Sequence, residues 1–130
     1  MCKMLLSINP EHVENIFNGT KQFEFRKVRC KPEVDKILIY ATAPQKMVVG
    51  EVEIEEIIVD EINEVWRQTK EFAGISYSFF RAYYKGKKKA VAYRLRNVEA
   101  YEHPRSLSEY GIEYPPQSFV YIRISNPMMD

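Results

Sequence analysis

The chain has 130 residues, 45% of them hydrophobic and 13% aromatic, with a formal net charge of +1 at pH 7. This length and apolar content predict one domain, residues 1–130, whose core needs neither a metal nor a disulfide. The near-zero charge excludes a global basic field, so any binding of nucleic acid must come from a local patch.

The ligand-type residues are few. Cys2 and Cys30 form no ligand-spaced cluster, and two cysteines suit a reducing compartment. The two histidines, His12 and His103, are separated by most of the chain, which predicts no metal site. Segment 1–8 is too short for a signal peptide, and no apolar run approaches the ~20 residues of a membrane helix. We therefore expect a cytoplasmic protein without metal, cofactor or membrane partner.

The first elements lead to a charged motif. Residues 3–8 are short and apolar and predict a buried strand. Asn9 is then a suitable N-cap and Pro10 a suitable first residue for a helix of about two turns. Gly19 ends this helix, because glycine enters the left-handed region without steric cost. A strand over 21–28 is expected to follow.

This second strand begins with charged residues between aromatic ones. Side chains alternate along a strand, so Phe23 and Phe25 share a core face while Glu24 and Arg26 share the other face. Lys21 lies at the turn into the strand and can swing toward that charged face. Together the three charged groups can bind an anion or hydrogen-bond a base edge. An ordinary solvated Glu–Arg pair would give the same spacing.

The remaining pattern groups strands at the two ends of the chain, with helices between them. Asp60 and Ser76 are the expected N-caps of the two central helices. The expected elements are strands over 34–42, 47–59, 87–101 and 118–125, helices over about 61–85, and a helical turn over 106–110. The pattern predicts an α+β fold, a small mixed β-barrel with short helices packed around it. Residues 126–130 are expected to be a disordered tail.

The densest positive region is the turn Lys85–Lys89, which is followed by Arg94 and Arg96. If it lay near the cations of the motif, it would form a phosphate-binding surface, although a solvated turn is the simpler interpretation. We expect the acidic strand face to lie elsewhere on the molecule; this face is formed by Glu51, Glu53 and Glu55.

The spacing Gly19-x-Lys21-x-x-Glu24-x-Arg26 after a short helix resembles the signature of the ASCH domain, a PUA-like β-barrel family. Three more features are similar: the strand over 37–42 with a proline soon after it, the returning strand over 48–52, and the segment 115–119 that leads into the final strand. Because these features span nearly the whole chain, it resembles a stand-alone, single-domain ASCH protein.

The resemblance implies a cleft between the barrel and its first helix, lined by Lys21, Glu24 and Arg26. PUA-like relatives bind RNA, so the implied partner is RNA or a modified nucleoside. Lys21 and Arg26 would hold a phosphate or a base carbonyl, and Glu24 would accept from a base amino group. Further candidate cleft residues are Lys46, Gln117 and Ser118.

Two other functions stay open, because a fold does not decide function. Some small ASCH proteins resemble amidohydrolases acting on N4-acetylcytidine, which implies Lys21 as catalytic base. Glu24 stands where those relatives carry a threonine, and it would then take an acid–base role. The third interpretation is a protein-interaction adaptor whose motif stabilises the barrel. The sequence does not indicate whether the protein is a monomer or an oligomer.

Overall fold

The computed structural model describes residues 2–123, which form one six-stranded sheet with helices at its ends. The strands are β1 (Cys2–Ile8), β2 (Phe23–Arg26), β3 (Val34–Ala41), β4 (Met47–Glu61), β5 (Lys89–Arg105) and β6 (Phe119–Arg123). Their order is β2-β5-β4-β3-β1-β6. β1 and β3 are parallel and the other neighbours are antiparallel. The predicted mixed α+β class is therefore confirmed.

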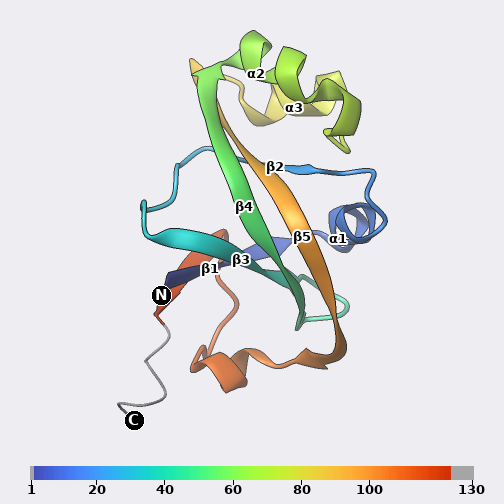
Figure 1. The fold of residues 1–130 in the computed structure, drawn as a ribbon, viewed down its shortest axis with the longest axis vertical. Helices are drawn as coiled ribbons and strands as arrows, with labels where there is room; N and C mark the ends of the chain where they lie inside the picture. The colour runs from blue at the N-terminus through green and yellow to red at the C-terminus, as the bar shows by residue number, and fades with distance from the viewer. Residues whose placement is uncertain (1, 124–130) are drawn as a thin grey trace.

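The helices lie in two places (Figure 1). α1 (Pro10–Phe17) lies beside β2, whereas α2 (Ile62–Thr69) and α3 (Tyr77–Tyr83) cover one end of the long strands β4 and β5. Short 3-10 turns, η1 (Lys70–Phe72) and η2 (Leu107–Tyr110), follow α2 and β5. None of the helices within residues 2–123 is long and apolar enough to cross a membrane. The expected tail, 126–130, lies outside the described residues.

Two of the three expected helix caps are present. The Asn9 side chain accepts from the backbone N–H of Glu11, and the Ser76 hydroxyl accepts from the N–H of Phe79. The prediction of Asp60 as an N-cap is wrong. β4 continues through Asp60 to residue 61, because both residues pair with the start of β5, and α2 begins only at residue 62.

The predicted small mixed β-barrel is not confirmed, because the sheet formed by residues 2–123 is not closed. β2 and β6 are the two edges of the sheet, and within residues 2–123 no ladder joins them. The Arg26 side chain reaches across instead. It donates to the Ser7 carbonyl at the end of β1, 2.9 Å away, and to the Ser118 hydroxyl just before β6, 3.2 Å away. Side-chain hydrogen bonds, rather than backbone pairing, thus connect the two edges.

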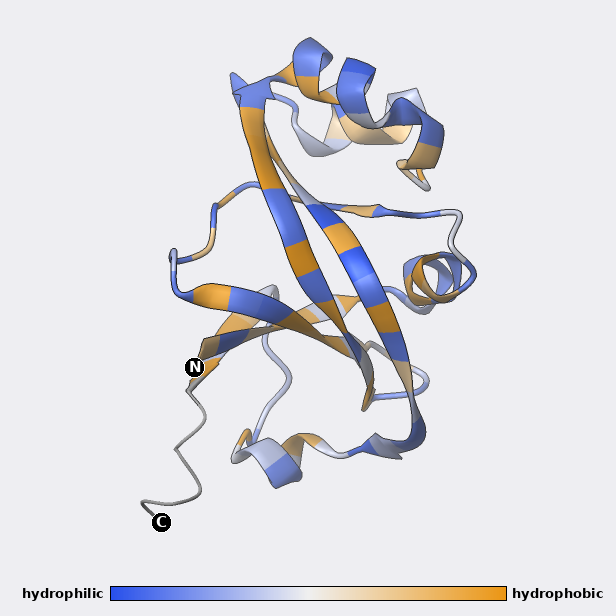
Figure 2. Ribbon diagram, viewed as in Figure 1, coloured by the Kyte–Doolittle hydropathy of each residue, from blue (hydrophilic) through white to orange (hydrophobic). Residues whose placement is uncertain are grey.

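The apolar side chains form a core on both sides of the curved sheet. Hydrophobic and hydrophilic residues alternate along β4 and β5 (Figure 2), as the period of a strand requires. Leu6, Ile39 and Tyr93 lie in the central cluster, which α1 also contacts. Phe23 and Phe25 lie in a second cluster beneath α2 and α3. The two aromatics of the motif therefore occupy the core face that the alternation predicts.

The expected separation of acidic and basic residues is wrong. Antiparallel pairing of β4 with β5 places Glu53 opposite Arg96 and Glu56 opposite Arg94. Arg94 Nε lies 2.7 Å from a Glu56 carboxylate oxygen, and Arg96 Nε lies 3.8 Å from one of Glu53. These two arginines therefore lie beside carboxylates of β4 and not on a separate basic surface.

Candidate functional site

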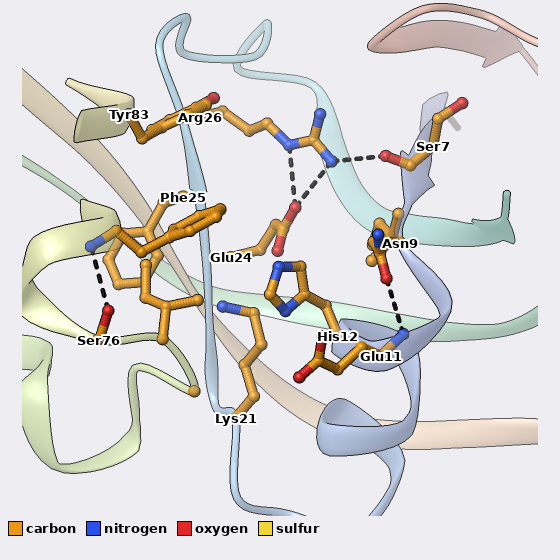
Figure 3. A pocket seen from close by; sticks show the side chains of 14 residues that line it. Ser7, Asn9, Glu11, His12, Lys21, Glu24, Phe25, Arg26, Ser76 and Tyr83 are labelled. Atoms are coloured by element: carbon orange, nitrogen blue, oxygen red, sulfur yellow. Dashed lines mark hydrogen bonds and ion pairs between the residues drawn. The ribbon is translucent and has the colours of Figure 1, made fainter. Parts of the chain in front are cut away.

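A pocket of about 650 Å³ lies between α1, β2 and the segment 74–76 that leads into α3 (Figure 3). Cavities of roughly 300–1,000 Å³ are typical of small-molecule sites. Three of the residues predicted from the sequence, Lys21, Glu24 and Arg26, line it together. Its wall is completed by His12 from α1 and by aromatic side chains of α3.

Lys21 supplies a buried ammonium group to this pocket. The residue is 2% exposed, and its Nζ donates to the Ala73 carbonyl at 2.7 Å. The same nitrogen lies 5.0 Å from the centre of the Phe25 ring, a cation–π contact. Burial lowers the pKa of Lys21, and the Glu24 carboxylate opposes this shift. An ammonium has three donor hydrogens, so two remain for a ligand after the bond to Ala73.

The segment before α3 packs tightly against the stem of Lys21. The Gln22 N–H donates to the Phe72 carbonyl at 2.8 Å, which ties this segment to the start of β2. Gly74 has φ +70°, and a Cβ built there would lie 2.5 Å from Lys21 Cβ and 2.6 Å from Lys21 Cγ. Only glycine fits this contact. In the sequence, Gly74 indicates only a break between the two expected central helices.

Glu24, which is buried, and Arg26, which is partly buried, form an ion pair in the wall of the pocket. Glu24 is 7% exposed, and its Oε2 accepts from Arg26 Nε at 3.0 Å and from Nη2 at 2.7 Å. Arg26 also holds Ser7 and Ser118, as described above, so its donors are largely used within the fold. Within residues 2–123 no hydrogen bond is made to the other oxygen of Glu24, Oε1. That oxygen is an acceptor available to a ligand.

His12 is a pocket residue that the sequence reasoning missed. Its Nδ1 is shielded from solvent and has no hydrogen-bond partner within residues 2–123. Burial lowers the pKa of His12, and the charge of Lys21 lowers it further. The ring meets the edge of Phe79, with centroids 5.9 Å apart. From the sequence alone, His12 is considered only as a metal ligand. Its position in the pocket depends on how α1 packs in the folded chain, which the sequence pattern does not give.

The other predicted site residues lie in different places. The Ser118 hydroxyl accepts from Arg26, but Ser118 is not among the residues that line the pocket. Lys46 in the β3–β4 turn and Gln117 before β6 are not among the lining residues. A ligand contact at these three residues stays a prediction. Within residues 2–123 there is no group of three or more His, Cys, Asp or Glu side chains that could hold a metal ion.

Comparison with known proteins defines the class of this protein. The family model for the ASCH domain matches residues 6–105, so the chain belongs to the ASCH domain family. The crystal structure of ASCH from Zymomonas mobilis superimposes with a TM-score of 0.83 at 32% identity, covering 93% of this chain and 87% of that one.

Two curated relatives show the sizes of protein in which this domain occurs. The "ASCH domain-containing ribonuclease" of Zymomonas mobilis is 32% identical over 123 residues, which is 92% of this chain and 83% of the relative. "Large ribosomal subunit protein uL22" of Ureaplasma parvum serovar 3 is 32% identical over 121 residues. That match covers 92% of this chain but 39% of the relative, so the chain spans about two fifths of its length.

Proposed function

We propose that this protein binds single-stranded RNA and takes one nucleotide into the pocket at Lys21. The observation that carries the proposal is the buried ammonium of Lys21, which lines a pocket of about 650 Å³ and donates one hydrogen bond to the Ala73 carbonyl. A relative 32% identical over 92% of the chain is named a ribonuclease, which supports RNA as the class of ligand.

The groups around Lys21 complement a nucleotide. The ammonium donates to a phosphate oxygen or a base carbonyl, and Glu24 Oε1 accepts from a base amino group. Arg26 orients Glu24 through two hydrogen bonds to its Oε2. Phe79 is 52% exposed on the pocket wall and offers its ring for base stacking. The pocket thus combines a cation, an acceptor and an aromatic surface.

Binding of a short labelled RNA of mixed sequence, followed by fluorescence anisotropy, tests the proposal. Lys21→Met keeps the volume of the stem and removes the charge, and a charged hydrogen bond is worth about 1.5–3 kcal/mol. The affinity of this variant should therefore fall by about ten- to a hundredfold. Lys36→Met is the matched control, since Lys36 pairs with Glu51 outside the pocket and should matter less than about twofold.

The salt dependence and the melting temperature separate the alternatives. Binding to phosphates weakens steeply as salt rises. The proposal is overturned if wild type does not bind RNA, or if Lys21→Met binds as tightly as wild type. If the protein is instead an adaptor whose motif only stabilises the fold, wild type should not bind RNA. The Lys21→Met variant should then have a lower melting temperature than wild type.

RNA cleavage is a second candidate, favoured by a nitrogen of His12 that has no hydrogen-bond partner within residues 2–123 and lies in the same pocket as Lys21. Because its pKa is lowered, His12 is neutral at pH 7 and can accept the proton of a ribose 2′-hydroxyl. The 2′-oxygen then bonds to the adjacent phosphorus, the bond to the 5′-oxygen breaks, and that oxygen takes up a proton from the imidazolium. Lys21 would stabilise the extra negative charge on the phosphate. The products would be a 2′,3′-cyclic phosphate and a 5′-hydroxyl.

Chromatography of incubated RNA detects those two ends. His12→Asn should abolish cleavage while the affinity for RNA stays within a few-fold of wild type. Retained cleavage in His12→Asn would exclude this role.

Deacylation of N4-acetylcytidine with Lys21 as base is tested by incubating wild type and Lys21→Met with this nucleoside; the lowered pKa of Lys21 favours such a role. Release of cytidine by wild type but not by Lys21→Met would support it.

A further inference from the structure

A second, shallower groove lies between α2 and α3. Its volume is about 290 Å³, and it is lined by Asn63, Trp66, Arg67, Lys70 and Tyr77. The rings of Trp66 and Tyr77 have centroids 5.4 Å apart and are tilted by 52°. Tyr77 is 45% exposed, so much of its ring is open to solvent. The groove is therefore an aromatic shelf on the surface of the helical end.

Basic side chains surround this shelf. Arg67 and Lys70 line it, and the Arg81 guanidinium lies 5.9 Å from the centre of the Tyr77 ring. Arg67 is paired with Glu64, at 2.5 Å. Within residues 2–123, no carboxylate forms an ion pair with Lys70 or Arg81. The groove thus carries positive charge that its surroundings do not neutralise.

The tyrosine is held so that its ring stays on the surface. Its hydroxyl donates to Asn63 Oδ1 at 3.2 Å and accepts from Arg81 Nη1 at 3.3 Å. Trp66 packs against Phe80, 5.0 Å between centroids, and so serves the core with part of its ring. A core role explains Trp66 but leaves the exposed ring of Tyr77 without one. An ordered, exposed aromatic ring beside cations is the arrangement on which bases of single-stranded RNA stack.

The groove adjoins the pocket along the chain. Ser76 lines the pocket and Tyr77, the next residue, lines the groove. Phe79 on the same helix lines the pocket, so the two sites lie on either side of the start of α3. We propose that the groove is a second nucleotide subsite, in which a base of the RNA strand leaving the pocket stacks on Tyr77 while Lys70 and Arg81 meet its phosphates. This inference rests on the proposed RNA binding.

A series of RNA lengths tests the subsite. The affinities of a mononucleotide, a dinucleotide and longer single-stranded RNAs are measured for wild type, Tyr77→Ala and Tyr77→Phe. Loss of one stacked base weakens binding by about 5- to 150-fold. Tyr77→Ala should therefore weaken binding of the longer RNAs by that factor and leave the mononucleotide unaffected. Tyr77→Phe, which retains the ring, should bind all lengths within a few-fold of wild type.

Tyr114→Ala is the control for loss of an exposed aromatic ring. Tyr114 is 75% exposed and comes after η2 in the chain. The turn η2, drawn in orange in Figure 1, lies at the end of the molecule opposite α2 and α3. The Tyr114→Ala variant should bind every RNA with the same affinity as wild type. If wild type binds the mononucleotide and the longer RNAs but Tyr77→Ala loses nothing with length, the second subsite is wrong and the pocket stands. If wild type binds no RNA or nucleotide of any length, the proposed function itself fails, and the subsite with it.

Discussion

Replacement of Gly74 by alanine is the sharpest test of how the site is built. The backbone at Gly74 has φ +70°, in the left-handed region, and a Cβ there would lie 2.5 Å from Lys21 Cβ. Lys21 Cγ and Cδ would lie at 2.6 and 2.9 Å. The contact involves the base of the lysine stem, which cannot rotate away. The strand or the segment before α3 must therefore move.

Two costs combine in Gly74→Ala. A residue with a Cβ in the left-handed region costs about 1–2 kcal/mol, and overpacking of a buried contact costs about 1–3 kcal/mol. The free energy of unfolding should therefore fall by about 2–5 kcal/mol, a large share of the 5–15 kcal/mol that is usual for a domain. At roughly 4 °C per kcal/mol for this size, the melting temperature should fall by about 8–20 °C.

Gly86→Ala provides the matched control. Gly86 has φ +81°, but a Cβ built there would meet no atom within 4 Å. It should lose only the backbone cost, about 1–2 kcal/mol. Urea denaturation of both variants, compared at equal m-values, gives the difference due to the contact with Lys21. Equal losses in the two variants would refute the tight packing of Gly74 on Lys21.

Three further predictions concern the charged groups of the pocket. Arg26→Met should lower the free energy of unfolding by about 3–5 kcal/mol, because it leaves the Glu24 carboxylate, whose side chain is 9% exposed, without its ion-pair partner; a loss below about 1 kcal/mol by urea denaturation would contradict this. Because burial lowers the pKa of Lys21 below its usual 10.5, the unfolded chain binds more protons in the alkaline range below 10.5. Wild type should therefore gain stability relative to Lys21→Met as pH rises there, and a pH-independent difference would rule out the shift. The pKa of His12 is likewise below its usual 6.5, so wild type should lose stability relative to His12→Asn as pH falls through 6.5, whereas parallel curves of unfolding free energy against pH would be inconsistent with this lowered pKa.

Local signals in the sequence were sufficient for most of the secondary structure. The caps Asn9 and Ser76 act on the nearest backbone N–H groups, so no distant residue is needed to place them. Asp60 failed as a cap because its backbone pairs with β5, about thirty residues later in the chain, and such pairing overrides a local preference. The same pairing brought the acidic residues of β4 beside Arg94 and Arg96.

The sequence by itself determined the family and the charged motif, because the spacing of Lys21, just before β2, from Glu24 and Arg26 within β2 is a local property. It did not determine the surroundings of that motif. His12 and Gly74 reach Lys21 from elements that meet β2 only in the folded chain. The burial of the lysine and its lowered pKa follow from this packing, and the second groove follows from the packing of α2 beside α3, so only the tertiary structure decided these features.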